Sequence, residues 1–258
     1  MEMVYVDAKK IKTELIRQKM SHFKGNLYHF SQVNFAYNSN KIEGSKLTED
    51  QTEAIFDTHS FIPKTDDLIK LDDLLEVKNH FKLFDYMLDI VDEEITLEMI
   101  IKIHSILKRG TSDEDNPLYN VGGFKKVPNI IGITNVIETS KPEDVTKDLN
   151  DLLKDYSSLK EVTLKNIIDF HVRFERIHPL SDENGRVGRI IMFKECLKNN
   201  IVPFIILDEE KAYYMGGLKE YNRDRKYLID TILHFQDIYD NLSEKLLDYN
   251  VKKNYIIL

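Results

Sequence analysis

The sequence predicts an all-α, mainly helical fold that carries one small β-hairpin, and three observations support this prediction. Apolar residues recur at helical spacing through most of the chain, whereas turn-forming residues concentrate in residues 111–141. The 258 residues, of which 42% are apolar, suffice for one large or two small cores. We expect an N-terminal helical region, residues 1–90, packed on a core of residues 91–250.

Two amphipathic stripes predict helices in the middle of the chain. Apolar positions recur at offsets of 4, 7, 8 and 11 residues from Val145. Pro142 precedes this stripe, and proline suits the first position of a helix. A second stripe begins at Leu164 behind the expected N-cap Thr163 and ends at Ile177. We expect a helix in each place.

Further helices are expected on both sides of these two. A stripe that begins at Thr96 stops at Gly110, a residue typical of helix ends. Thr48 and Gln51 have the spacing of a capping box. Helical patterns also cover residues 187–198, 208–219 and 223–249.

Residues 111–141 depart from the helical pattern. They are rich in Gly, Asn, Asp, Ser and Pro and contain two β-branched runs, Ile130-Ile131 and Val136-Ile137. Such runs between turn residues predict a small β-hairpin inserted between core helices. Because long, partly extended insertions are often functional, we expect this one to act as a flap.

Charge and composition argue against several classes of protein. The net charge of −8 is unlike that of a general nucleic-acid coat, because phosphate backbones are bound by basic surfaces. The single cysteine, Cys196, allows no intrachain disulfide and fits a reducing compartment. The start of the chain lacks the apolar core of a signal peptide, and no apolar run is long enough to span a bilayer. We expect a cytoplasmic protein that binds neither nucleic acid nor membrane.

The run from His178 to Arg189, His-Pro-Leu-Ser-Asp-Glu-Asn-Gly-Arg-Val-Gly-Arg, holds most of the chemical information. His178 follows a helix, and an imidazole can take a proton from a hydroxyl near neutral pH. Asp182 offers an oxygen ligand suited to Mg²⁺. Together they indicate chemistry on a metal-bound polyphosphate beside a nucleophilic hydroxyl.

The second half of the run has the features of a phosphate-binding loop. Asn184 and Gly185 can adopt left-handed or turn conformations that direct N–H groups into a concavity at a helix N-terminus. Arg186 and Arg189 lie three residues apart and can fork onto phosphate oxygens, while Gly188 permits a close approach. Since arginines oppose the helix dipole there, a bound anion would explain them.

Each of these features also has an ordinary structural explanation. A lone His-Pro is usually a loop, a lone Asn-Gly is usually a turn, and arginines at a helix start are most often solvated or paired with surface acids. Their combination within twelve residues favours a functional site.

The run resembles the motif of the Fic family, His-x-Phe-x-(Asp/Glu)-Gly-Asn-Gly-Arg-x-x-Arg. The matching positions, in register, are His178, Asp182, Asn184, Gly185, Arg186 and Arg189. The resemblance implies a helical Fic core over roughly residues 96–230 that transfers AMP from ATP to a hydroxyl side chain of a target protein. No Gly-Lys-Ser/Thr loop is present, which argues against a P-loop nucleotidase.

By this resemblance, His178 is the general base on the target hydroxyl and Asp182 holds Mg²⁺. Arg186 binds the β-phosphate of the substrate ATP, and Arg189 binds its γ-phosphate. The tyrosines Tyr214 and Tyr221 lie where family members often bind adenine, although helix tyrosines are usually core residues. The expected catalytic residues are His178, Asn184 and Arg186, and the expected nucleotide-binding residues are Glu183, Asn184, Gly185, Arg186, Gly188, Arg189, Tyr214 and Tyr221.

Two positions depart from the family motif. Leu180 stands where Phe is usual, and both can anchor the loop in the core. Glu183 replaces the first glycine, at a cost of about 1 kcal/mol or more if the backbone needs a positive φ. Its carboxylate would also repel a phosphate unless it faces solvent or joins Asp182 at the metal, so the rate and the preferred nucleotide stay open.

A second motif lies far from the first. Ser39-Asn-Lys-Ile-Glu43-Gly44 matches the inhibitory pattern (Ser/Thr)-x-x-x-Glu-(Gly/Asn) of many Fic proteins. The alternative is an ordinary helix end with Gly44 after the last turn. The resemblance implies that Glu43 pairs with Arg189 and denies its fork to the γ-phosphate.

Alternatives remain open at this stage. Within the same fold they are removal of AMP, with Glu43 positioning a water, and transfer of another nucleotidyl or phosphate group. A catalytically weak peptide-binding module is a further alternative, and a DNA-binding regulator is disfavoured by the charge. The expected partner is a target protein that adds a strand to the flap around Lys125–Thr134, and a homo-oligomer is compatible with the sequence. His104 and His171 are expected to be hydrogen-bonded core histidines.

Overall fold

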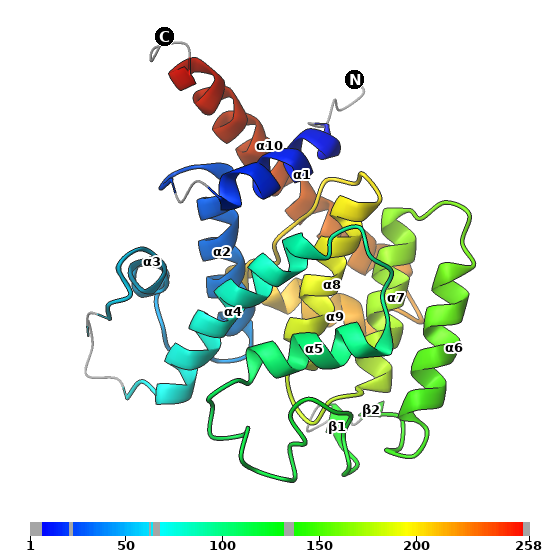
Figure 1. The fold of residues 1–258 in the computed structure, drawn as a ribbon. Helices are drawn as coiled ribbons and strands as arrows, with labels where there is room; N and C mark the ends of the chain where they lie inside the picture. The colour runs from blue at the N-terminus through cyan, green and yellow to red at the C-terminus, as the bar shows by residue number, and fades with distance from the viewer. Residues whose placement is uncertain (1–6, 21–22, 62, 64–67, 132–136, 255–258) are drawn as a thin grey trace.

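The protein is described by a computed structural model that covers residues 7–20, 23–61, 63, 68–131 and 137–254. Helices make up most of it, which confirms the predicted all-α class with one small strand pair (Figure 1). The elements are α1 (Ala8–Lys19), α2 (Leu27–Ile42), α3 (Glu49–Thr58), α4 (Leu71–Asp89), α5 (Leu97–Leu107), β1 (Ile130–Ile131), β2 (Ile137–Glu138), α6 (Val145–Ser157), α7 (Leu164–Ile177), α8 (Asn184–Lys198), the 3₁₀ helix η1 (Asp208–Glu210), α9 (Lys211–Glu220) and α10 (Arg225–Asn254).

Helix α8 lies at the centre of the fold, with α1, α2, α4, α5 and α7 packed around it (Figure 1). Nearly all of its residues are buried. A helix that is buried on every side has no amphipathic stripe, so periodicity cannot locate its start. This is why the helix predicted over residues 187–198 begins three residues earlier, at Asn184.

An aromatic cluster joins the N-terminal helices to α8. The ring of Phe193 on α8 lies 5.4 Å, centroid to centroid, from Phe35 of α2 and also 5.4 Å from Phe84 of α4. The N-terminal helices therefore share one core with the helices that carry the motif. The predicted division between residues 1–90 and 91–250 stays a prediction.

Threonine caps begin α3, α5 and α7, which confirms the predicted caps Thr48 and Thr163 and adds one at Thr96. Thr48 and Gln51 form a reciprocal capping box, and the hydroxyls of Thr96 and Thr163 accept N–H bonds from the first turns of their helices. The prediction for Pro142 is wrong, because α6 begins three residues later, at Val145. The carbonyl of Lys141 accepts the N–H groups of Asp144 and Val145, so Pro142 lies in the turn before the helix.

The predicted hairpin is present between α5 and α6. Strands β1 and β2 pair antiparallel, with Ile130 opposite Glu138 and Ile131 opposite Ile137 (Figure 1). The residues that connect them, including Val136 and the last three of Lys125–Thr134, lie outside the described part of the chain. The helix predicted over residues 208–219 is present as η1 followed by α9.

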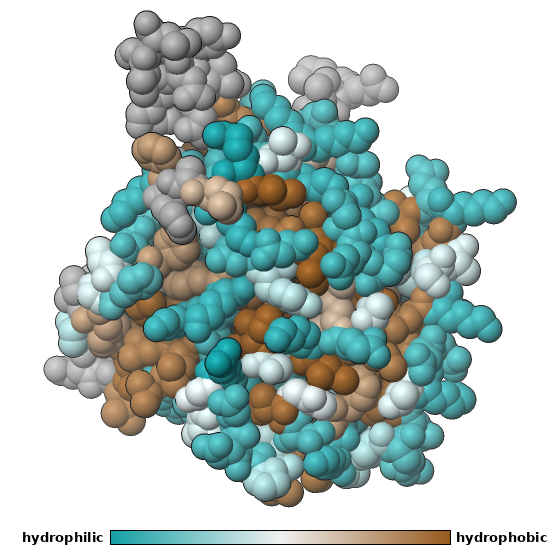
Figure 2. Space-filling model, viewed as in Figure 1, coloured by the Kyte–Doolittle hydropathy of each residue, from teal (hydrophilic) through white to brown (hydrophobic). Residues whose placement is uncertain are grey.

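The surface shown in Figure 2 is mostly hydrophilic, with apolar residues visible between the polar ones. Among the helices of the described residues, none is both long enough and apolar enough to span a bilayer.

Candidate functional site

His178 occupies the first position after α7, as the sequence predicted. Its φ of 50° is left-handed, which ends the helix, and its Nδ1 lies 3.2 Å from the carbonyl oxygen of Glu175. An N–H on Nδ1 would donate to that carbonyl and leave Nε2 as the acceptor. Burial lowers the pKa of His178, and the nearby Lys125 ammonium lowers it further, against the opposing hydrogen bond to Glu175. The imidazole is thereby kept neutral, the form that a general base requires.

Leu180 and Asn184 hold the loop that follows. The Leu180 side chain is fully buried, so it anchors the loop as expected for this departure from the motif. Asn184 accepts the N–H of Leu180 at 2.9 Å and donates to the carbonyl of Leu180, also at 2.9 Å. The Asn184 amide therefore closes the loop on itself and fixes the start of α8.

The left-handed residue in this loop is Glu183, with a φ of 71°. The expectation that Asn184 or Gly185 would take that conformation is wrong, because both already belong to α8. The motif's missing glycine thus falls where a positive φ is needed, and Glu183 carries a conformational cost of about 1 kcal/mol.

The two glycines in the first turns of α8, Gly185 and Gly188, permit close approaches by other side chains. A Cβ added at Gly185 would lie 2.5 Å from Oε1 of Glu43. A Cβ added at Gly188 would lie 2.6 Å from the ring of His171 on α7. The close approach predicted at Gly188 is therefore made by His171, which packs α7 against α8.

Arg189 is held by the second motif. Its Nε donates to the hydroxyl of Ser39 at 3.0 Å, and its Nη2 donates to the Ser39 carbonyl at 3.0 Å and to Oε1 of Glu43 at 2.7 Å. Gly44 follows the end of α2 with a φ of 99°. The segment is thus both a helix end and the partner of Arg189.

Arg186 is buried and bound to other side chains. Its Nη1 donates to Asn40 at 2.7 Å and to Glu76 at 2.5 Å, and its Nη2 contacts the carboxylate of Glu183. The acids that pair with Arg186 are therefore internal, unlike the surface acids of the ordinary explanation, whereas Glu43, which pairs with Arg189, is partly exposed. A contact between Arg186 and a β-phosphate stays a prediction.

A cavity of about 240 Å³ brings five of the predicted residues together, namely Glu43, His178, Gly185, Arg189 and Tyr214, whereas Asp182 and Arg186 do not line it. His178, Arg189 and Glu43 line it, and Ile131 of β1 forms part of its wall. Its other lining residues are Val172, Glu175, Arg176, Gly185, Tyr214, Met215, Leu218 and Lys219. The cavity therefore unites the base, one arginine, the second motif and the hairpin.

The two predicted adenine-binding tyrosines are separated. Tyr214 lines this cavity, and its hydroxyl lies 2.6 Å from Nε2 of His171, which confirms His171 as a hydrogen-bonded core histidine. Tyr221 instead borders a different cavity of about 370 Å³ beside α6, α7 and α10. The buried His104 fits a core position, as expected.

Sequence reasoning missed two charged residues here. Glu175 is half-buried near Arg189 and lines the cavity, and desolvation of its carboxyl raises its pKa to about 7. Lys108, just after α5, is buried and contacts Asp182 at 2.8 Å. Neither position stands out in the sequence. Glu175 is a charged residue next to an apolar stripe and belongs to no motif, and Lys108 is an ordinary basic residue at a helix end.

The hairpin segment is fastened to the motif loop. The N–H of Lys125 donates to the carbonyl of Pro179 at 2.8 Å, and the side chain of Asn129 donates to the carbonyl of Leu180 at 3.0 Å. The Lys125 side chain is itself buried, and burial lowers its pKa to about 8. Lys125 therefore holds the flap in place.

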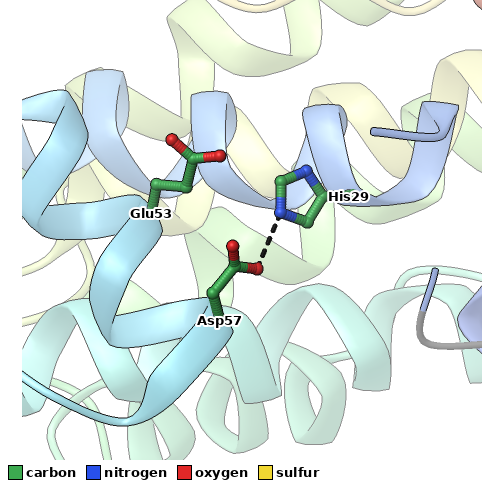
Figure 3. Close-up of side chains that lie close together, drawn as sticks. All are labelled: His29, Glu53 and Asp57. Atoms are coloured by element: carbon green, nitrogen blue, oxygen red, sulfur yellow. Dashed lines mark hydrogen bonds and ion pairs between the residues drawn. The ribbon is translucent and has the colours of Figure 1, made fainter. Parts of the chain in front are cut away.

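A second group of potential metal ligands lies away from this site, on α2 and α3. Nε2 of His29 is 2.9 Å from Asp57, with Glu53 beside them (Figure 3). The ammonium of Lys24 contacts the other oxygen of Asp57 at 2.8 Å. The Asp57 carboxylate is thus already paired with a cation, and the group joins α2 to α3.

The chain matches known proteins over the elements that build the site. Residues 94–196 match the model of the Fic/DOC family, a span that contains the hairpin, α7 and the whole motif run. These residues are a Fic/DOC family domain. The Fic domain predicted from the motif is therefore confirmed.

Two curated relatives carry activity names. The chain is 27% identical over 190 residues to protein adenylyltransferase Fic of Nematostella vectensis, covering 72% of this chain and 42% of that protein. It is 32% identical over 129 residues to a probable protein adenylyltransferase of Aquifex aeolicus, covering 45% of this chain and 34% of that one. The chain thus spans less than half the length of these two relatives.

Solved structures share the Fic fold with this chain. A Fic domain containing signaling protein from Bacteroides thetaiotaomicron superposes with a TM-score of 0.73 at 18% identity, covering 93% of this chain and 95% of that one. Fic-1 of Caenorhabditis elegans superposes with a TM-score of 0.68 at 18% identity, covering 92% of this chain and 71% of that one. The likeness includes the N-terminal helices, since it extends over nearly the whole chain.

Proposed function

We propose that this Fic domain is a Mg²⁺-dependent protein adenylyltransferase that Glu43 holds inactive. The observation that carries the proposal is the shared cavity. His178 and Arg189 both line it, and the guanidinium of Arg189 is hydrogen-bonded to the carboxylate of Glu43. The names of the curated relatives support the same activity. Adenylyl transfer needs a base for the hydroxyl and cations for the phosphates, and both are present at this cavity.

The residues have separate roles in this proposal. Nε2 of His178 accepts the proton of the target hydroxyl as its oxygen bonds to the α-phosphorus of ATP, while the bond from that phosphorus to the α–β bridging oxygen breaks and pyrophosphate leaves. Arg189 binds the γ-phosphate once Glu43 has moved away. The N–H groups at the start of α8 stabilise phosphate charge through the positive end of the helix dipole. These contributions are mainly positioning and electrostatic stabilisation.

The donor set at Asp182 fits Mg²⁺. The Asp182 side chain is 48% exposed, and its pKa is lowered by the Lys108 ammonium despite burial, so it is ionised at neutral pH. Carboxylate oxygens are the ligands that Mg²⁺ prefers, usually with waters and substrate phosphates completing its shell. When bound, the ion would neutralise phosphate charge; Asp182 would hold it.

The hairpin is the proposed docking place for the target protein. Ile131 of β1 lines the cavity, while its neighbour Ile130 is 59% exposed. A target segment that adds a strand along β1 would carry its hydroxyl towards His178. This supports a protein target rather than a small-molecule acceptor.

Intact mass spectrometry tests the proposal directly. Wild type, Glu43→Gly, the isosteric Glu43→Gln and His178→Ala are incubated with Mg²⁺ and ATP. An adduct of AMP mass on both Glu43 variants, weak on wild type and absent from His178→Ala, is the expected result. An adduct of phosphate mass would favour phosphoryl transfer instead, and the absence of any adduct on folded Glu43 variants would count against the proposed adenylyl transfer, for which the protein itself serves here as the acceptor.

Removal of AMP is the second candidate, because Glu43 and His178 line the same cavity and Glu43 could orient a water there. The two activities make opposite predictions. Glu43→Gln should gain transfer and lose hydrolysis of an AMP-modified peptide. Loss of hydrolysis without any gain in transfer would favour removal as the function.

A further inference from the structure

The buried ammonium of Lys108 lies at the centre of a group of four carboxylates, of which Glu183 is fully buried. Its ammonium nitrogen is 2.8 Å from Glu76, 2.8 Å from Asp113, 2.8 Å from Asp182 and 2.9 Å from Glu183. The residue itself is only 2% exposed. No other ammonium or guanidinium of the described residues is recorded with as many carboxylate partners.

Of the four carboxylates, that of Glu183 would interfere most with a bound nucleotide if it turned towards the start of α8. It takes the left-handed position immediately before α8, at the end of the helix that is expected to receive phosphates. Its carboxylate is nevertheless fully buried and contacts Lys108 and Arg186. Burying a carboxylate is costly unless cations and hydrogen bonds compensate for lost water, so this orientation depends on its two partners.

The carboxylates of the group outnumber its cations. Four carboxylates, those of Glu76, Asp113, Asp182 and Glu183, share two cations, Lys108 and Arg186. Removing the ammonium would raise the formal excess of carboxylates from two to three. That excess would lie directly behind the start of α8, where it opposes a polyphosphate.

We propose that Lys108 is the positioning residue that makes Glu183 compatible with a nucleotide. The ammonium keeps the Glu183 carboxylate turned into the protein and compensates for its charge, so that the N–H groups of α8 stay free to bind phosphates. The role in nucleotide binding rests on the proposed function, whereas the pairing itself does not. A positioning role differs from a merely structural ion pair because it predicts dependence on the number of phosphates.

A double-mutant cycle tests this proposal in the Glu43→Gly background, in which Arg189 is accessible. The variants are Lys108→Met, Glu183→Gly and the two combined, and calorimetry gives the Kd values of ATP, ADP and AMP. Lys108→Met should weaken ATP binding about tenfold, equivalent to about 1.4 kcal/mol, with a smaller effect for ADP and the smallest for AMP. The combined variant should bind ATP as the background protein does, because removing Glu183 removes the need for the ammonium.

Lys194→Met provides a matched control. Lys194 is also buried, and its ammonium pairs with Glu195 at 2.8 Å on α8, at the far end from the motif. This control should lower stability without a loss of affinity that grows with the number of phosphates. An equal loss for AMP and ATP in Lys108→Met would overturn the positioning role.

Two further readouts keep the proposal decidable. Should Lys108→Met fail to fold, the ATP affinities of Glu183→Gly and of the combined variant are compared instead. Equal affinities support the proposal, and a tenfold weaker affinity of the combined variant overturns it. Urea unfolding without nucleotide should show that Glu183→Gly offsets part of the destabilisation by Lys108→Met. Additive effects would overturn the pairing. If the background protein binds no ATP, the proposed function fails while this unfolding cycle still decides the pairing.

Discussion

Replacing Glu43 by Gln should lower the stability of the protein and raise its affinity for ATP. The change keeps the size of the side chain and removes the charge that faces Nη2 of Arg189 at 2.7 Å. Arg189 is 4% exposed and Glu43 is 36% exposed at the side chain, so the pair is only partly screened by water. A hydrogen bond between charged groups contributes about 1.5–3 kcal/mol, and the partial exposure of Glu43 places this pair near 1.5 kcal/mol.

The same energy should appear with opposite signs in two measurements. Without nucleotide, Glu43→Gln should lower the free energy of unfolding in urea by about 1–2 kcal/mol. With ATP, whose γ-phosphate competes with Glu43 for Arg189, the affinity measured by calorimetry should rise about tenfold, since about 1.4 kcal/mol corresponds to a factor of ten. AMP, which has no γ-phosphate, should bind both proteins alike.

Ser39→Ala supplies the control for this prediction. The Ser39 hydroxyl holds Nε of the same arginine at 3.0 Å, but it carries no charge. Its loss should destabilise the protein without an ATP-specific gain. An equal gain for AMP and ATP in Glu43→Gln, or no gain in a stable protein, would refute the view that Glu43 excludes the γ-phosphate.

Three further predictions test the base, the helix packing and a cap. Because burial lowers the pKa of His178 and a base acts in its deprotonated form, the acidic limb of kcat/KM in Glu43→Gly should have its midpoint below 6.5; a higher midpoint would contradict this. Gly188→Ala should lower the free energy of unfolding by about 1–3 kcal/mol, because its Cβ would lie 2.6 Å from the ring of His171. An unchanged urea midpoint would show that the ring moves freely. Thr48→Ala should cost about 1 kcal/mol by opening the capping box with Gln51, also read from urea unfolding.

Local sequence signals predicted the helices well, whereas ion pairs between residues far apart in the sequence could not be predicted. The caps at Thr48 and Thr163 act within one turn, so their sequence spacing is sufficient to find them. The start of α8 could not be found in this way, because the helix is buried all round. The hairpin, α6 and α7 all lie between Lys108 and Glu183 in the sequence, and no local pattern links the two residues.

The partner of Arg189 was accessible only through the resemblance to the Fic family. Glu43 and Arg189 are 146 residues apart, and on its own the segment around Glu43 has the pattern of a helix end. Glu183 is the opposite case. A cost for positive φ was expected from its place in the motif, but the direction of its carboxylate depends on Lys108 and Arg186, which only the folded chain brings together.

The two motif arginines differ in whether their carboxylate partners can leave. The partners of Arg186 are Glu76 and Glu183, whose side chains are 13% and 0% exposed, so releasing them would strand buried charges. The partner of Arg189 is 36% exposed, stands at the end of α2 and lines the cavity. A phosphate can therefore take the place of Glu43 at modest cost, whereas it cannot displace Glu183 in the same way. If the proposed function holds, we expect a nucleotide to recruit Arg189, and we expect Arg186 to act chiefly with Lys108 in compensating the negative charge at the start of α8.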